Sequence, residues 1–409
     1  MRRVRDRRGF LRGAAAACIV GLAGCLGDSD EGGPDGVDVD VEPGDPEAGE
    51  DWSTFQFDSA NTGRAPGQGP TDDVEAKWTF STGGTVYSSP AVVDDTVYVG
   101  SNDGTVYALA ADDGEETWRH STGDSVSSSP AVDDGVVYVG SQDGTVYALA
   151  ADDGETVWEF ETGDKVAGSP VVDDGVVYVG SNDGTVYALS TDGGDDLWRF
   201  ETDGPVQRSP AVTDDGVFAG SGDGSLYAID RESGDGRWAV ETDDWIQSRP
   251  TVADGVVYVG SNDDRVYSVD AESGDVRWTF LTEGSVTASP AVIEDVVYVG
   301  SFDNRMYALS AEATEADEPT EDGEDDPGDP ATYYWAASGF QQIRSSPAAV
   351  GDTIYVGNED SYVYALSAVD GETRWRFSTD GGVPSSPAVV DGVVYVGSQD
   401  DRLYALEES

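Results

Sequence analysis

Short runs in which hydrophobic and polar residues alternate fill most of the chain after residue 75. In one copy of the pattern these runs span residues 89–93, 96–100, 105–109 and 116–120. Each has the length and alternation of a β-strand, and none follows the period of an amphipathic helix. The turn Asn102-Asp103-Gly104 joins the second and third runs, because an Asp-Gly pair readily adopts the positive φ of a tight hairpin. The pattern predicts an all-β body.

The four-run unit is repeated eight times, most clearly at one tryptophan per unit. These residues are Trp78, Trp118, Trp158, Trp198, Trp238, Trp278, Trp335 and Trp375. The spacing is 40 residues throughout, except for one step of 57 between the sixth and seventh copies. A four-stranded unit of this size cannot bury both of its faces alone, so its copies must pack on one another. The repeat therefore predicts an eight-bladed β-propeller, with the eight tryptophans packed between blades.

The phase of the repeat predicts how the ring closes. The body starts on a fourth-strand segment, residues 75–80, and ends on a third-strand segment, residues 402–406. The last blade would otherwise lack its outer strand, so we expect the N-terminal segment to supply it and to remove an exposed sheet edge.

The first residues have the composition of an export signal. The apolar stretch from Ala14 to Ala23 follows a basic flank and is too short to span a membrane. The flank resembles a twin-arginine signal in its residues Arg7, Arg8, Phe10 and Leu11. The end of the stretch resembles a lipobox, which implies that residues 1–24 are removed and Cys25 is lipidated. We expect a lipid-anchored protein on the extracellular face of the cell membrane; an uncleaved anchor is the alternative.

Two acidic segments lie outside the repeat. Residues 25–51 are rich in Asp, Glu, Gly and Pro, and we expect a flexible tether between the lipid and the propeller at 52–409. An acidic insertion at 311–331 interrupts the turn before Trp335. We expect a tolerated surface segment there, on the face opposite the arginines described below; docking of a basic partner is the alternative.

The charge of the whole chain is strongly negative. It holds 81 Asp and Glu against 22 Lys and Arg, for a net charge of −59. Such a surface excludes binding to nucleic acid through a basic face. The acids occur in every repeat, and 1 M salt screens charges beyond about 3 Å. We interpret the acidity as adaptation to high salt, of the halophilic-archaeal type; recruitment of cations or basic partners is the alternative.

Residues able to hold a metal or catalyse a reaction are scarce. Two Cys and one His leave no disulfide framework and no Cys/His metal site. The Ser beside each repeated Pro is no nucleophile, because one His cannot serve a triad in eight places. We expect no metal site and no catalytic residue.

The departures from the repeat carry more information about binding. Ahead of the first strand the repeat has small, uncharged residues, and the exceptions there are Arg208, Arg249, Arg344, Gln207, Gln247, Gln341 and Trp245. First strands line the central channel of a propeller, so we expect these side chains at one channel mouth. They could hold an anion or the carboxylates of a partner. The alternative is that each arginine pairs with neighbouring Asp or Glu.

Residues 52–407 resemble the PQQ-type propeller repeat. The resemblance rests on the pattern V-x-S-S-P-A-V-x-D-G-x-V-Y-V-G-S-x-D-G-x-V-Y-A-L and on a lead-in with Trp52-Ser53-Thr54-Phe55 and Asn61-Thr62-Gly63. This family includes quinoprotein alcohol dehydrogenases, which hold pyrroloquinoline quinone (PQQ) and calcium at the centre of the ring. It also includes non-enzymatic lipoproteins similar to BamB, the outer-membrane assembly factor.

The resemblance favours the non-enzymatic branch. The dehydrogenases sandwich the quinone between a Trp and a disulfide of adjacent cysteines, and this chain has no adjacent Cys pair. We expect a monomeric scaffold without a cofactor that binds cell-surface or membrane proteins. A PQQ-dependent dehydrogenase of reduced type, with calcium, is one alternative; a binder of a small anionic ligand is another.

Overall fold

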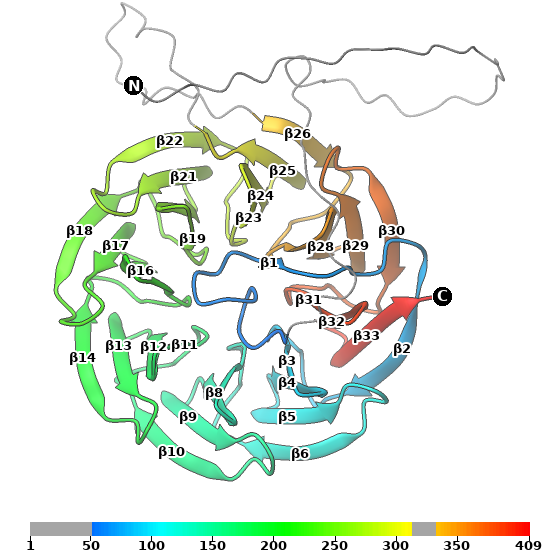
Figure 1. Ribbon diagram of the computed structural model, residues 1–409, viewed down its shortest axis with the longest axis horizontal. Coiled ribbons are helices and arrows are strands. Elements are labelled where there is room, and N and C mark those ends of the chain that lie inside the picture. The colour runs from blue at the N-terminus through cyan, green and yellow to red at the C-terminus, as the bar shows by residue number, and fades with distance from the viewer. Residues whose placement is uncertain (1–50, 313–332) are drawn as a thin grey trace, which may run out of the picture. The chain divides into compact units, whose positions relative to one another are not determined.

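The computed structural model describes residues 51–312 and 333–409. Eight antiparallel sheets follow one another around a central channel (Figure 1). Each sheet has the four strands of one blade, and one sheet carries β1 (Arg64–Ala65) as an additional strand that pairs in parallel. The predicted eight-bladed β-propeller is confirmed. No helix in these two ranges is long and apolar enough to cross a membrane.

In seven blades the strands run in sequence order from the channel to the outer rim, and in the last blade the outermost strand comes from the beginning of the propeller. The first strands are β3 (Ala91–Val93), β7 (Ala131–Asp133), β11 (Val171–Asp173), β15 (Ala211–Thr213), β19 (Thr251–Ala253), β23 (Ala291–Ile293), β27 (Ala348–Val350) and β31 (Ala388–Val390). The second strands are β4 (Thr96–Ser101), β8 (Val136–Gly140), β12 (Val176–Gly180), β16 (Gly216–Gly220), β20 (Val256–Gly260), β24 (Val296–Gly300), β28 (Thr353–Asn358) and β32 (Val393–Gly397).

The outer two strands complete each blade. The third strands are β5 (Thr105–Ala110), β9 (Thr145–Ala150), β13 (Thr185–Ser190), β17 (Ser225–Ile229), β21 (Arg265–Asp270), β25 (Arg305–Ser310), β29 (Tyr362–Ser367) and β33 (Arg402–Glu408). The fourth strands are β6 (Glu116–Ser121), β10 (Thr156–Glu161), β14 (Asp196–Glu201), β18 (Gly236–Glu241), β22 (Val276–Leu281), β26 (Tyr333–Ser338), β30 (Thr373–Ser378) and β2 (Val74–Ser81).

The last blade takes its outer strand from the beginning of the propeller, as predicted. Strand β2 pairs antiparallel with β33, and Trp78 lies opposite Ala405. Trp375 of the preceding blade donates its indole N–H to the carbonyl of Pro70, 2.7 Å away, just ahead of β2. The N-terminal segment thus supplies both the missing strand and its contact with the neighbouring blade.

The periodic tryptophans pack between blades. The indole N–H of Trp78 donates to the carbonyl of Ala111 in the next blade (2.8 Å), and six further tryptophans make the same bond 33 residues ahead. The Trp78 ring lies against Gly114, where a Cβ would come within 2.7 Å of it. Gly114 also has φ of +71°, so only glycine suits this turn.

The repeated Asp residues have a structural role in the hairpin turns. The carboxylate of Asp103 accepts hydrogen bonds from the hydroxyl of Tyr107 (2.7 Å), the N–H of Thr105 (2.9 Å) and the N–H of Gly83 (2.6 Å). The Tyr–Asp hydrogen bond recurs in all eight blades. Each of these carboxylates therefore accepts hydrogen bonds from within the propeller and has a structural role in its hairpin turn.

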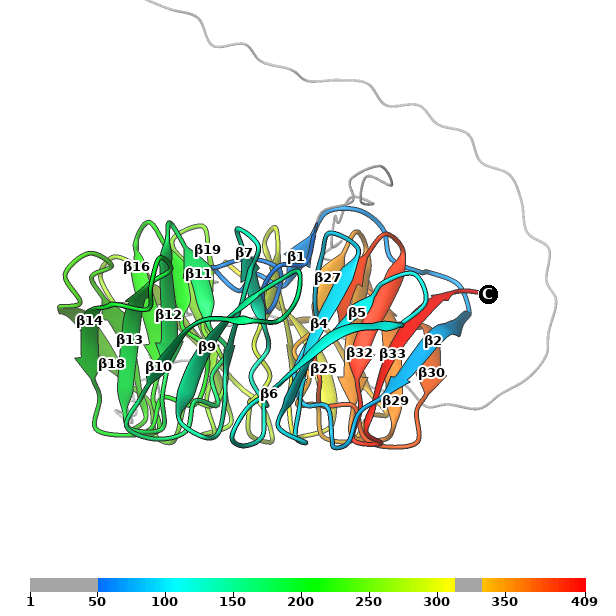
Figure 2. The same ribbon diagram turned by 90° about the horizontal axis from the view of Figure 1, so that it is seen from below.

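The lead-in, residues 52–65, runs inside the ring and closes one end of the channel (Figures 1 and 2). We call it the plug. Its backbone carbonyls accept hydrogen bonds from the N–H groups of Val92, Val132, Val212, Val252, Val292 and Ala349, each the second residue of a first strand. Its Asn61 amide donates to the carbonyls of Pro210 and Pro250 at 3.0 and 3.1 Å. The channel therefore opens only at the face where the first strands begin.

Three predicted segments lie wholly or mostly outside the described residues. They are the signal peptide at 1–24, the tether at 25–51 and the insertion at 311–331. The insertion joins β25 to β26, the third and fourth strands of the sixth blade, which is where the repeat predicts it.

The strands themselves match the sequence closely, with one difference. The first strand of each blade begins one residue after the repeated Pro, at Ala91 in place of the predicted residue 89. The Ser-Pro segment ahead of it bonds to neighbouring blades, as described next.

Candidate functional site

Seven serines form a ring around the open end of the channel. The backbone N–H of Ser89 donates to the hydroxyl of Ser129, 3.0 Å away in the next blade, and the bond is repeated from blade to blade. Ser386 closes the circle by donating to the hydroxyl of Ser89 at 2.9 Å. We call this set the serine ring; its members are Ser89, Ser129, Ser169, Ser209, Ser289, Ser346 and Ser386.

Arg249 takes the eighth place in the serine ring. Its backbone N–H donates to the Ser289 hydroxyl (3.0 Å), as a serine there would. Its side chain turns back along the wall, and its guanidinium donates to the hydroxyls of Ser209 (3.0 Å) and Ser169 (3.2 Å). The guanidinium carbon lies 3.4 Å from the ring centroid of Phe55, a buried residue of the plug. Arg249 therefore rests on the closed end of the channel.

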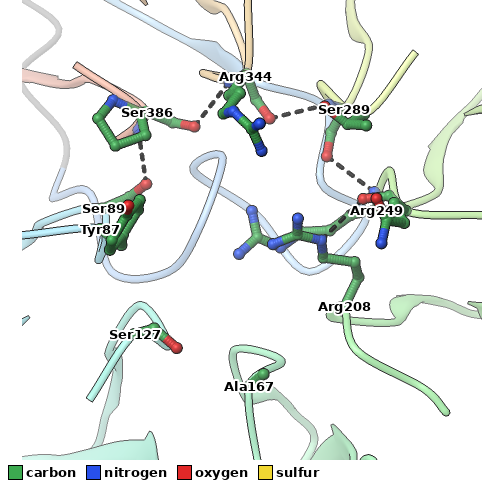
Figure 3. A pocket seen from close by; sticks show the side chains of 13 residues that line it. Tyr87, Ser89, Ser127, Ala167, Arg208, Arg249, Ser289, Arg344 and Ser386 are labelled. Carbon is green, nitrogen blue, oxygen red and sulfur yellow. Dashed lines mark hydrogen bonds between the residues drawn. The ribbon is translucent and has the colours of Figure 1, made fainter. Parts of the chain in front are cut away.

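Arg208 enters the same space from the fourth blade (Figure 3). Its Nε donates to the backbone carbonyl of Gln247 at 2.8 Å. Within residues 51–312 and 333–409, no carboxylate lies within 4.0 Å of the charged nitrogens of Arg208 or Arg249. Burial lowers the pKa of both groups; the charge of Arg344 lowers that of Arg208 further, and Arg208 does the same to Arg249.

Arg344 behaves differently from the other two arginines. Its Nε lies 3.2 Å from a carboxylate oxygen of Glu359. Its guanidinium also lies over the ring of Phe302, 4.8 Å from the centroid. Internal pairing, the alternative weighed from the sequence, therefore describes Arg344, whereas Arg208 and Arg249 are held by neutral partners.

The remaining predicted residues spread over the same face. Gln247 lines the cavity with the arginines, and Gln207 beside Arg208 is half-buried. Gln341 lies at a neighbouring hollow together with Arg344. Trp245 is 43% exposed.

Three residues of this region were not singled out from the sequence. Tyr87 lines the cavity at the position that Ser127 and Ala167 occupy in the next two blades. Phe302 and Glu359 stand in hairpin turns where other blades have Asn, Gln or Gly. The same signal, a departure from the repeat, could have identified all three.

Together these residues line a polar cavity of about 180 Å³ at the open end of the channel. Its wall consists mainly of hydroxyls from the serine ring and of the Arg208, Arg249 and Arg344 side chains. The arrangement offers hydrogen-bond donors and positive charge, and its lining residues include no Asp or Glu.

This lining does not fit PQQ with calcium. Calcium binds six to eight oxygens with carboxylates among them. The cavity offers no carboxylate and presents three guanidinium groups, which would repel the ion. No group of three or more His, Cys, Asp or Glu in the described parts of the chain could hold a metal ion. The only cysteines of the sequence, Cys18 and Cys25, precede the propeller.

The fold and the channel define the class of protein: an eight-bladed propeller of PQQ-like repeats whose channel is open at one end. The family described as outer membrane protein assembly factor BamB matches residues 71–181, 102–244, 223–317 and 327–409. The chain belongs to this family. No curated protein matches it in sequence.

Solved structures agree on the fold. BamB from Moraxella catarrhalis is 21% identical with a TM-score of 0.68, covering 82% of this chain and 98% of its own. Quinohemoprotein alcohol dehydrogenase from Comamonas testosteroni is 17% identical with a TM-score of 0.71, covering 87% and 80%. The computationally designed protein Ika8 is 16% identical with a TM-score of 0.69, covering 81% and 99%. An enzyme, an assembly factor and a designed protein share this architecture, so the fold alone does not define a reaction.

Proposed function

We propose that the protein is a non-enzymatic scaffold that binds other proteins through the face of the propeller that carries the open channel. The family match supports this, because its description names an assembly factor. The misfit of the cavity to calcium argues against the dehydrogenase alternative, which stays a hypothesis drawn from the resemblance.

The observation that carries the proposal is the placement of exposed aromatic side chains. Among the described residues, the large aromatics that stand well exposed are Tyr87 (41%) and Trp245 (43%). Both lie in the segments that lead into first strands, on the face of the open channel. Tyr, Trp and Arg are the residues most enriched where proteins bind one another. The other exposed hydrophobic side chains are aliphatic.

A hollow beside the cavity extends this surface. It measures about 620 Å³ and is lined by Tyr87, Arg344, Glu359 and three glutamines, among others. In this part of the face Arg344 pairs with Glu359 and lies over the Phe302 ring. Arginine and aromatic side chains are enriched where proteins bind one another.

We further infer that the scaffold is exported and lipid-anchored at the outer side of the cell membrane of a salt-adapted cell. Arg7, Arg8 and the lipobox with Cys25 support export and lipid anchoring, and the net charge of −59 supports the salt adaptation. Arg7, Arg8 and Cys25 precede the described part of the chain, so the inferred location of the protein rests on the sequence.

Site-specific photo-crosslinking in source cells, at the salt concentration of their medium, tests the scaffold. A photoreactive amino acid replaces Tyr87 or Trp245 on the channel face, and Leu197 on the outer strand β14 serves as the matched exposed control. We expect a discrete crosslinked protein from the first two positions only. Equal products from all three positions, or none from any, would overturn the proposal.

A further inference from the structure

The open channel holds two positive charges without a negative partner. Arg208 and Arg249 are half-buried, and their hydrogen-bond acceptors are a backbone carbonyl and two serine hydroxyls. The net charge of the chain is −59, so carboxylates are abundant on it, yet none of the described ones reaches either group. Two neighbouring cations that are partly removed from water are costly unless an anion compensates them.

Both guanidinium groups have N–H donors that make no hydrogen bond within the described parts of the chain. A guanidinium has five N–H bonds, and Arg208 uses one of them while Arg249 uses two. In Figure 3 the Arg208 and Arg249 side chains reach into the middle of the channel. Ala167 lies on the wall of the next blade, two residues from the Ser169 that Arg249 contacts, and Ser127 lies one blade further along. The planar guanidinium matches the paired oxygens of a carboxylate, phosphate or sulfate.

We propose that the open end of the channel binds one small oxyanion, held between Arg208 and Arg249. The cavity of about 180 Å³ accommodates a few atoms beyond the charged group itself. The plug closes the channel behind it, and Phe55 covers one face of the Arg249 guanidinium. The ligand therefore enters and leaves through the mouth.

This site is independent of the proposed scaffold role. Trp245 does not line the cavity, and Tyr87, which does, is 41% exposed at its mouth, whereas the oxyanion would lie between Arg208 and Arg249. Arg344 already has Glu359 as its partner, so it contributes positive potential more than free donors. Loss of anion binding and loss of partner binding can thus be measured separately.

Isothermal titration calorimetry with the purified propeller, residues 51–409, tests the proposal after its folding has been verified by circular dichroism. The probes are succinate, inorganic phosphate and sulfate, each added against a constant background of potassium chloride. We expect saturable binding with a stoichiometry of one for at least one probe. Arg208→Gln should raise its Kd at least about tenfold, because hydrogen bonds to charged groups are among the strongest.

A second pair of variants keeps both arginines. Ala167 lines the same cavity in the blade next to that of Arg208, and Ala167→Asp would place a carboxylate in the cavity as an internal substitute for the anion. We expect Ala167→Asp to abolish binding and to raise the melting temperature. Ala167→Asn has the same shape without the charge and should keep the Kd within about threefold, since the two arginines are untouched.

Each outcome decides the proposal. Binding that is lost in Arg208→Gln and Ala167→Asp but kept in Ala167→Asn supports it. The absence of saturable binding for all three probes would overturn it. Binding that survives unchanged in Ala167→Asp would also overturn it, because the anion would then sit elsewhere on the protein.

Discussion

The guanidinium of Arg249 lies over the ring of Phe55, with 3.4 Å between its carbon and the ring centroid. Phe55 belongs to the plug and Arg249 to the segment that leads into the fifth blade, so the contact joins the closed end of the channel to its wall. The same arginine bonds to Ser209 of the fourth blade and Ser169 of the third. One side chain therefore connects the plug with three blades.

Phe55 should contribute strongly to stability. Phe55→Ala removes a buried aromatic ring and the cation–π contact, and we expect a loss of about 3–5 kcal/mol in the free energy of unfolding. Denaturant titration followed by tryptophan fluorescence measures it. Leu197→Ala, at an exposed position of β14, should change the value by no more than about 0.5 kcal/mol. An equal effect of the two substitutions would show that the plug does not support the ring.

The tight contact of Gly114 with Trp78 can be separated from the effect of its φ angle. Gly135 has a similar φ of +75°, but a Cβ there would meet nothing within 4 Å. Gly135→Ala should cost about 1 kcal/mol, for backbone strain alone. Gly114→Ala should cost at least about 2 kcal/mol more, because its Cβ would overlap the indole ring. Unfolding free energies of the two variants provide the measurement, and equal values would contradict the packing role of Trp78.

Deletion of β2 should destroy the closed ring. Without residues 74–81 the strand β33 becomes an exposed edge, and such edges pair with other molecules. We expect oligomers and a broad unfolding transition, measured by size-exclusion chromatography with light scattering and by calorimetry. Replacement of the exposed Thr79 by Ala within β2 is the control and should leave the monomer intact. A monomeric deletion variant with a sharp transition would refute the closure.

Stability should fall in alkaline solution. Burial, together with hydrogen bonds to Asp103, Asp143 and Asp400, raises the pKa of Tyr107, Tyr147 and Tyr404 to about 12, above the ordinary value of 10. The phenols are neutral in both states below pH 10, so their full contribution is present there. Between pH 10 and 12 they ionise more easily in the unfolded chain, and the contribution is lost as the pH rises.

The melting temperature measured from pH 8 to 12 checks this dependence. The triple variant with Phe at positions 107, 147 and 404 should show a smaller decline above pH 10 than the parent protein. Identical profiles would exclude these tyrosines as the cause.

The proposed lipidation of Cys25 predicts how the protein partitions between membrane and medium. Cys25→Ser should move it from the membrane fraction to the medium of the source cells, because the anchor would be missing. Cell fractionation and immunoblotting measure the shift. Cys18→Ser, within the expected signal, is the control and should leave the protein in the membrane fraction. Membrane retention of Cys25→Ser would favour the uncleaved anchor.

The sequence predicted the blades, their order and the closure by β2 because every blade needs the same Trp, Gly and Asp contacts. The residues that make these contacts therefore recur at a fixed spacing, which is visible in the sequence. The plug could not be traced in the same way, since residues 52–65 follow no repeat and bond to first strands all around the ring.

The hydrogen-bond and ion-pair partners of the arginines could not be predicted from the sequence. Arg208, Arg249 and Arg344 stand two, one and three residues ahead of the repeated Pro, so their side chains leave the wall in different directions. The partner of Arg344, Glu359, comes from the hairpin turn of its own blade, whereas Arg249 reaches serines of other blades. Which arginine meets a carboxylate is thus determined by the three-dimensional arrangement of the blades, and the sequence leaves that open.

The pairing of β2 with β33 also imposes an order on folding. During synthesis β2 leaves the ribosome more than three hundred residues before its partner exists. Seven blades can form while the chain grows, but the eighth must wait for β33. The ring therefore cannot close before β33 has been made, and a system that transports this protein receives either an open chain or a finished ring.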